Sequence, residues 1–156
     1  MKRTLKASIA GVALTLFGLG TYEAIRHVKN SPRASQEARA HQVQAFEVDP
    51  SWIREGKPSF RATEFFKSSD GKTSSGIFEC DAGKFEWHYQ FDEAVYILEG
   101  SVNIDYQGKQ FTLKAGESAF FRAGTSAQWD VPQHIKKTWT LYDAGKHARG
   151  LARFFE

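Results

Sequence analysis

The chain has 156 residues, a formal net charge of +3 and a single cysteine, Cys80. A chain of this length forms one domain with additional segments, and one cysteine excludes an intramolecular disulfide framework and a cysteine zinc cluster. Residues 1–40 hold seven Lys/Arg and two Asp/Glu, whereas the remainder holds fourteen and sixteen. The positive charge therefore belongs to the N-terminal part, and the sequence predicts no nucleic-acid partner.

The start of the chain predicts a membrane-targeting segment. Lys2, Arg3 and Lys6 precede an uncharged apolar run from Ala7 to Tyr22, a pattern typical of insertion with the N-terminus in the cytoplasm. As a helix this 16-residue run is about 24 Å long, which is short for a hydrocarbon core of about 30 Å. The preferred interpretation is an anchor through residues 7–25 in the inner membrane, with the domain in the periplasm. The alternative is cleavage, which gives a secreted or periplasmic protein.

From Ser59 onward the sequence changes to short alternating segments separated by turn residues. The breaks are Asp70-Gly71, Ala82-Gly83, Glu99-Gly100, Gln107-Gly108, Ala115-Gly116, Ala123-Gly124 and Pro132. Close, regular spacing of this kind predicts an antiparallel β-sandwich or barrel. The expected strands are Phe60–Phe66, Gly76–Cys80, Phe85–Phe91, Ala94–Glu99, Val102–Tyr106, Phe111–Lys114, Ala119–Arg122, Ala127–Val131 and Lys137–Tyr142.

Two segments resemble the sequence motifs of the cupins. Asp92–Gly100 matches the first motif, in which a Glu is followed by six residues and a Gly. Gly116–Gly124 has the glycine spacing of the second motif, with Arg122 in place of its proline. Together with Gly76–Cys80 and Phe85–Trp87, these segments resemble small single-domain cupins related to ureidoglycine aminohydrolase and ethanolamine-utilisation proteins.

The resemblance implies a mainly β fold with a single cupin barrel of the jelly-roll type, here preceded by the N-terminal hydrophobic helix. It is specific for the fold and much less so for an activity. The predicted organisation is a membrane anchor or signal segment at 1–25, a linker and lead-in at 26–58, the barrel at 59–143 and a C-terminal tail at 144–156.

Many cupins bind iron, manganese or another divalent ion through histidines and one glutamate, so the resemblance directs attention to Glu93. Counting back from Glu93 with a three-residue gap, the first two histidine positions are Trp87 and Tyr89. With a four-residue gap they are Glu86 and His88. Neither spacing supplies the pair of histidines that the motif requires.

The third histidine position, three residues after Gly124, is Ala127. A stable divalent site needs several well-placed nitrogen or oxygen donors, so the sequence predicts no metal. The alternative is a weak manganese, iron or zinc site whose ligands are His88, Gln90 and Glu93.

Strand parity predicts an aromatic interior instead of a metal site. Side chains alternate between the two faces of a strand, which places Phe85, Trp87, Tyr89 and Phe91 on one face and His88 on the other. The apolar set is expected to face the interior. The predicted ligand pocket surrounds one carboxylate and consists of Trp87, Tyr89, Glu93, Phe121, Trp129, Lys137 and Trp139.

Parts of this pocket have a plainer structural explanation. The aromatic residues could simply fill the core of a small barrel. Lys137 shares its parity with Trp139 and could reach Glu93, or it could be a solvent-exposed lysine at a strand end. Cys80 is expected to be a small apolar strand residue rather than a nucleophile.

The preferred functional interpretation is an exported or membrane-anchored protein that binds a small polar metabolite in the barrel, without the usual cupin metal. The alternative, implied by the resemblance, is a metal-dependent enzyme of the ureidoglycine aminohydrolase type, acting on a small ureide, sugar or amino-acid derivative. A third interpretation is a homodimer, because Tyr96 and Leu98 have the parity of an outer apolar face that a partner would bury.

Overall fold

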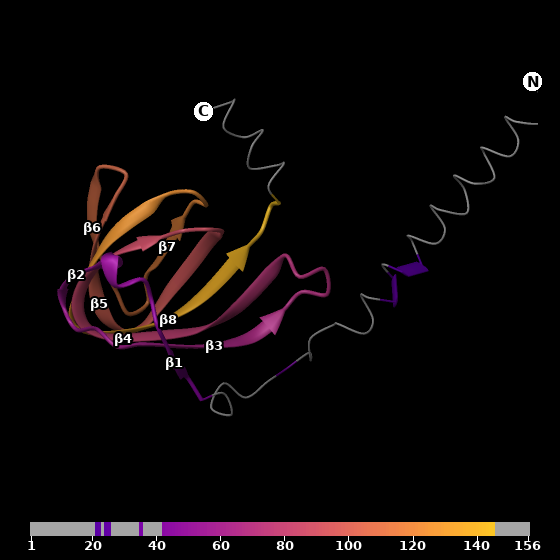
Figure 1. The fold of residues 1–156 in the computed structure, drawn as a ribbon, viewed down its shortest axis with the longest axis horizontal. Coiled ribbons are helices and arrows are strands. Elements are labelled where there is room, and N and C mark those ends of the chain that lie inside the picture. Colours follow the sequence, from indigo (N-terminus) through magenta and orange to yellow (C-terminus); the bar gives the residue numbers. More distant parts are fainter. Residues whose placement is uncertain (1–20, 23, 26–34, 36–41, 146–156) are drawn as a thin grey trace, which may run out of the picture.

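The computed structural model describes residues 21–22, 24–25, 35 and 42–145. From residue 42 to residue 145 its elements are β-strands and one short 3-10 helix, so the expectation of a mainly β fold is confirmed. In chain order (Figure 1) these elements are β1 (Gln44–Phe46), η2 (Pro50–Trp52), β2 (Ile53–Gly56), β3 (Phe60–Lys67), β4 (Thr73–His88), β5 (Asp92–Tyr106), β6 (Lys109–Lys114), β7 (Ser118–Phe121) and β8 (Ser126–Tyr142).

The predicted N-terminal hydrophobic helix lies almost entirely outside the described residues. Within the part of the chain that the structure describes, no helix is long and apolar enough to cross a membrane. Most of the predicted C-terminal tail is also outside the described residues, which end at Gly145. The membrane anchor or signal segment therefore stays a prediction from the sequence.

All the strands belong to one antiparallel sheet, in the order β1-β3-β4-β8-β5-β6. The long strands β4, β8 and β5 lie side by side in its centre, β2 also pairs with β4, and β7 also pairs with β5. Figure 1 shows the sheet curling around an interior. Among the described strands, β1 and β6 are the two ends of the sheet and do not pair with each other, so the predicted closed barrel is wrong. A barrel needs a continuous ladder around its wall, and β1, with three residues, offers few backbone groups for closing it.

Three predicted breaks are bends inside continuous strands rather than turns. Ala82-Gly83, Glu99-Gly100 and Pro132 all lie within β4, β5 or β8, where the pairing register shifts. A β-bulge places an extra residue in one strand, which bends the strand without ending it. The six strands predicted in these regions are therefore wrong as separate elements, and they form the three long central strands.

The predicted turn at Gln107-Gly108 is confirmed. These two residues connect β5 to β6 with φ angles of 50° and 75°, which are the left-handed values of a two-residue hairpin loop. Tyr106 and Lys109 pair directly across the turn. The hairpin sets the register of β6 against the second half of β5.

The sheet begins before the predicted boundary at Ser59. Both β1 and β2 lie in the segment expected to be linker and lead-in, and they pair with β3 and β4. The ring centroid of Phe46 in β1 lies 6.1 Å from that of Phe60 in β3. Aromatic packing thus ties this short edge strand to the interior.

The inner face of the sheet carries the apolar set that strand parity predicts. On β8 the side chains of Ala127, Trp129 and Val131 are each 2% exposed, and on β4 Phe85 is 1% exposed. The alternating inside and outside positions place these residues in one cluster. Its other buried members are Phe60, Phe78, Cys80, Tyr89, Val95, Ile97, Val102, Ile104, Leu113, Phe121 and Ile135.

The outer apolar face predicted from Tyr96 and Leu98 is present. Tyr96 is 46% exposed and Leu98 is 37% exposed. Phe120 on the neighbouring strand β7 pairs with Ala94 and is 57% exposed, which extends this face. The homodimer that such a face suggests stays a prediction.

Candidate functional site

The interior of the sheet contains one buried ion pair, between Glu93 and Lys137. Their strands β5 and β8 are hydrogen-bonded neighbours, and both side chains have inward parity. Glu93 is 5% exposed and Lys137 is 3% exposed, and Lys137 Nζ donates to Glu93 Oε1 over 2.6 Å. The expectation that Lys137 could reach Glu93 is confirmed, and the alternative of a solvent-exposed lysine is wrong.

Two aromatic rings accompany the Lys137 ammonium. Its Nζ lies 4.7 Å from the ring centroid of Trp129 and 5.0 Å from that of Phe78. The negative potential of a ring face attracts a cation at such distances. Because a buried charge is strongly unfavourable without compensation, the carboxylate and the two rings together account for the stable burial of this lysine.

A layer of stacked aromatic residues fills the space next to the ion pair. The ring centroids of Tyr89 and Phe121 are 4.6 Å apart and the rings are nearly parallel, and Trp129 Nε1 donates to Tyr89 Oη over 3.0 Å. Burial, followed by the neighbouring Glu93 carboxylate, raises the pKa of Tyr89 far above its ordinary value, so the phenol stays neutral. Of the predicted pocket residues, Phe121 and Trp129 are therefore buried core residues.

An open cavity with a volume of about 220 Å³ has Glu93 in its lining. Of the predicted pocket residues, Trp87, Tyr89 and Glu93 line it, whereas Phe121, Trp129, Lys137 and Trp139 do not. The complete lining is Trp52, Trp87, His88, Tyr89, Gln90, Phe91, Glu93 and Leu141. Glu93 is thus the residue that belongs to both the buried ion pair and the cavity.

Trp52 is a cavity residue that the sequence reasoning missed. It ends η2, a turn that begins with Pro50 and is capped by Asp49, whose side chain accepts from Ser51 N over 2.9 Å. The ring centroid of Trp52 lies 5.5 Å from that of Trp87. The available signal was a tryptophan directly after Asp-Pro-Ser, the pattern of a capped turn.

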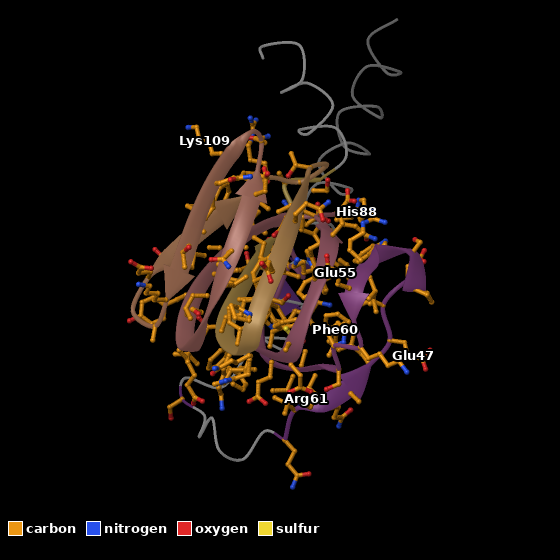
Figure 2. All side chains as sticks on the ribbon, turned by 90° about the vertical axis from the view of Figure 1, so that its left-hand side faces the viewer. Glu47, Glu55, Phe60, Arg61, His88 and Lys109 are labelled. Carbon is orange, nitrogen blue, oxygen red and sulfur yellow. The ribbon has the colours of Figure 1, made fainter. Side chains whose placement is uncertain are left out.

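The alternative metal ligands His88, Gln90 and Glu93 all line this cavity, but they do not form a convincing metal site. The His88 side chain is 46% exposed, and its ring centroid lies 4.8 Å from that of Trp52. Figure 2 shows His88 near the segment that carries η2 and β2. Glu93 Oε1 already accepts from the Lys137 ammonium, so this oxygen is not free to bind a metal ion.

Within the described residues, no group of three or more His, Cys, Asp and Glu side chains is placed to hold a metal ion. A single histidine, an amide and a carboxylate shared with a lysine are a poor donor set for manganese, iron or zinc. The residues present therefore do not fit the ion that many cupins contain.

Cys80 lies in β4 and is fully buried, as expected for a small apolar strand residue. Burial raises the pKa of its thiol to about 12. Because the thiolate is the nucleophilic form, Cys80 stays protonated and unreactive at neutral pH.

Comparison with known proteins shows what the central part of the chain resembles. Residues 67–139 match the family model of the EutQ-like cupin domain. An acetate kinase EutQ of Clostridioides difficile (strain 630) is 28% identical over 69 residues, which are 44% of each chain. The acetate kinase EutQ of Salmonella typhimurium is 25% identical over 83 residues, which are 53% of this chain and 36% of the relative. The chain therefore spans less than half the length of these curated relatives.

Solved structures show the same fold at low sequence identity. A Pseudomonas syringae pv. tomato protein of unknown function, from the DUF861 family, has a TM-score of 0.60 and 17% identity, over 71% of this chain and 50% of that one. The Clostridium difficile EutQ protein has a TM-score of 0.50 and 22% identity, over 55% of this chain and 64% of that one. The expected resemblance to ethanolamine-utilisation cupins is confirmed, since residues 67–139 of this chain match the EutQ-like cupin domain.

Proposed function

We propose that this chain binds a small polar metabolite in the cavity beside Trp52 and Trp87, with Glu93 as its polar anchor and without the usual cupin metal. The observation that carries the proposal is a nearly buried carboxylate that lines an aromatic cavity. Apolar walls with a few well-placed polar groups are the common form of a small-molecule site.

The contact with Lys137 supports Glu93 as the anchor. In this contact Lys137 Nζ donates to Glu93 Oε1 over 2.6 Å, so the lysine occupies one of the two carboxylate oxygens. The ammonium restricts the rotation of the carboxylate, since a charged hydrogen bond of this length is strong. A ligand donor at Oε2 would complete the coordination of a carboxylate that the fold has already oriented.

Binding can be measured on the full-length protein in detergent, through the fluorescence of Trp52 and Trp87. We expect at least one compound among small amines, amides, carboxylates and sugars to change the emission saturably. In Glu93→Gln the Kd of that compound should rise at least tenfold, which corresponds to about 1.4 kcal/mol, because the charged acceptor is lost.

Glu79→Gln is the matched control. Glu79 is also a lysine-paired glutamate, with Lys136 Nζ 2.9 Å from its Oε1, but it does not line the cavity. It should leave the Kd unchanged. An unchanged Kd in a folded Glu93→Gln protein would reject Glu93 as the anchor, and a full equivalent of manganese, iron or zinc that survives dialysis would contradict the metal-free part of the proposal.

We also propose that residues 7–25 anchor the chain in the inner membrane, with the cupin domain in the periplasm. The support is the sequence alone: Lys2, Arg3 and Lys6 before an apolar run. The C-terminally tagged full-length protein should stay in carbonate-washed membranes, and added protease should degrade the domain in spheroplasts. A version without residues 7–25 should leave the membrane fraction. A shortened periplasmic product would show cleavage instead, and full-length protein in the cytoplasmic fraction would contradict both versions.

A further inference from the structure

We infer that the ligand of the Glu93 cavity is a small organic ammonium ion, of the size of choline, held between the carboxylate and the surrounding aromatic rings. This inference rests on the proposed function and names the class of ligand that the site accepts. Its basis is the chemistry of the cavity wall and a second ammonium that the protein itself contains.

The cavity wall combines a carboxylate with four aromatic side chains, those of Trp52, Trp87, Tyr89 and Phe91. Ring faces attract cations within about 6 Å, and tryptophan does so most strongly. The lining contains neither lysine nor arginine. An anionic metabolite would therefore find no lysine or arginine on this wall, whereas an organic cation would meet aromatic side chains and a carboxylate residue.

The side chain of Lys137 is an ammonium that this protein already stabilises with a carboxylate and aromatic rings. On the interior side of Glu93, its Nζ is held by Oε1 and lies within 5.0 Å of two aromatic ring centroids. On the cavity side, Glu93 belongs to a lining that again contains aromatic residues, including Trp87 and Tyr89. A ligand ammonium at Oε2 would repeat on the cavity side the arrangement seen around Lys137.

The ion pair with Lys137 also determines which cation fits best. Glu93 is already neutralised by one ammonium, so it cannot offset the dehydration of a small, strongly hydrated ion such as Na⁺. A methylated ammonium spreads its charge over a larger surface and matches the ring faces of Trp52 and Trp87. The cavity of about 220 Å³ has room for about seven water-sized atoms, which is enough for a choline-sized cation.

The test compares two ligands of the same shape on the full-length protein in detergent. Choline chloride is titrated against tryptophan fluorescence and by calorimetry, at constant ionic strength with NaCl. The neutral isostere 3,3-dimethylbutan-1-ol is titrated in the same way. Choline should bind at least tenfold more tightly than the isostere, because only choline carries the charge that the carboxylate and the rings attract.

Trp52 lines the cavity and is only half-buried, so its variants are expected to fold. They therefore test the inference even if Glu93→Gln does not fold. Trp52→Leu should weaken choline binding at least fivefold, whereas Trp52→Phe should retain most of it, since an aromatic face remains. Tyr96→Leu, which removes an exposed aromatic ring on the outer face, should leave the Kd unchanged.

The possible outcomes separate this inference from the proposed function. Equal affinity for choline and its isostere overturns the ammonium class. Binding of a sugar, an amide or a carboxylate that depends on Glu93, without any response to choline, also overturns the ammonium class and leaves the proposed function standing. A protein that binds none of these compounds contradicts both.

Discussion

Lys137→Met should lower the free energy of unfolding by about 3–5 kcal/mol. The substitution leaves Glu93 as an uncompensated buried carboxylate, because Lys137 Nζ is the partner of its Oε1 at 2.6 Å. Methionine keeps much of the side-chain volume, so the loss reports the missing charge rather than a cavity. Thermal and urea unfolding, followed by circular dichroism, measure the change.

Lys136→Met is the matched control, in the adjacent position of the same strand. Lys136 faces outward, and its Nζ lies 2.9 Å from Glu79 Oε1 with both side chains partly exposed. Such a pair contributes about 0–1 kcal/mol. The double variant Glu93→Gln/Lys137→Met should recover most of the stability, because it removes both charges. Equal losses in Lys136→Met and Lys137→Met would contradict the structural importance of the buried pair.

Gly100→Ala should lower the free energy of unfolding by more than about 4 kcal/mol, an exceptionally large loss for one substitution, or prevent folding. Gly100 has a φ of 78°, and an added Cβ would lie only 2.0 Å from the carbonyl oxygen of His134. The clashing atoms belong to the backbone of the neighbouring strand β8, which cannot move aside as a flexible side chain would. The yield of folded protein and the unfolding midpoint measure the effect.

Gly116→Ala provides the comparison for Gly100→Ala. Gly116 also has a left-handed backbone, with a φ of 93°, but a Cβ there has no heavy atom within 4 Å. Only the conformational penalty remains, which is about 1–2 kcal/mol for a non-glycine residue. Similar losses in the two variants would show that backbone strain, rather than close approach of β8, makes glycine necessary at residue 100.

These two glycines show which structural details the cupin resemblance predicted correctly and which it did not. The motif spacing placed Gly100 and Gly116 correctly as positions of unusual backbone conformation. It predicted strand ends at both, but Gly100 lies inside β5, at a point where the pairing with β8 shifts. A glycine in a sequence indicates a left-handed backbone or a close approach of neighbouring atoms. Both a turn and a bulge create such a position, so the glycine alone does not tell them apart. Only the presence of a neighbouring strand distinguishes them.

Alternation along the strands made the inward faces predictable from sequence. Phe85, Tyr89 and Trp129 are buried as their parity indicates, and His88 is exposed on the other face. Side-chain direction follows from local backbone geometry with a period of two, so the sequence alone contains this information. The family resemblance likewise follows from short segments whose spacing can be counted.

Tertiary structure decided which of those inward residues form a site. Glu93 and Lys137 are 44 positions apart, and the register between β5 and β8, including its bulges, brings them together. Trp52 lines the cavity from the turn η2 in the lead-in, whereas Trp129 and Phe121 pack against each other in the core. The sequence by itself determined the mainly β domain, its aromatic inner face and the lack of the cupin histidines. The open sheet, the buried ion pair and the boundary between core and cavity depend on strand register and side-chain volume, which no local pattern encodes.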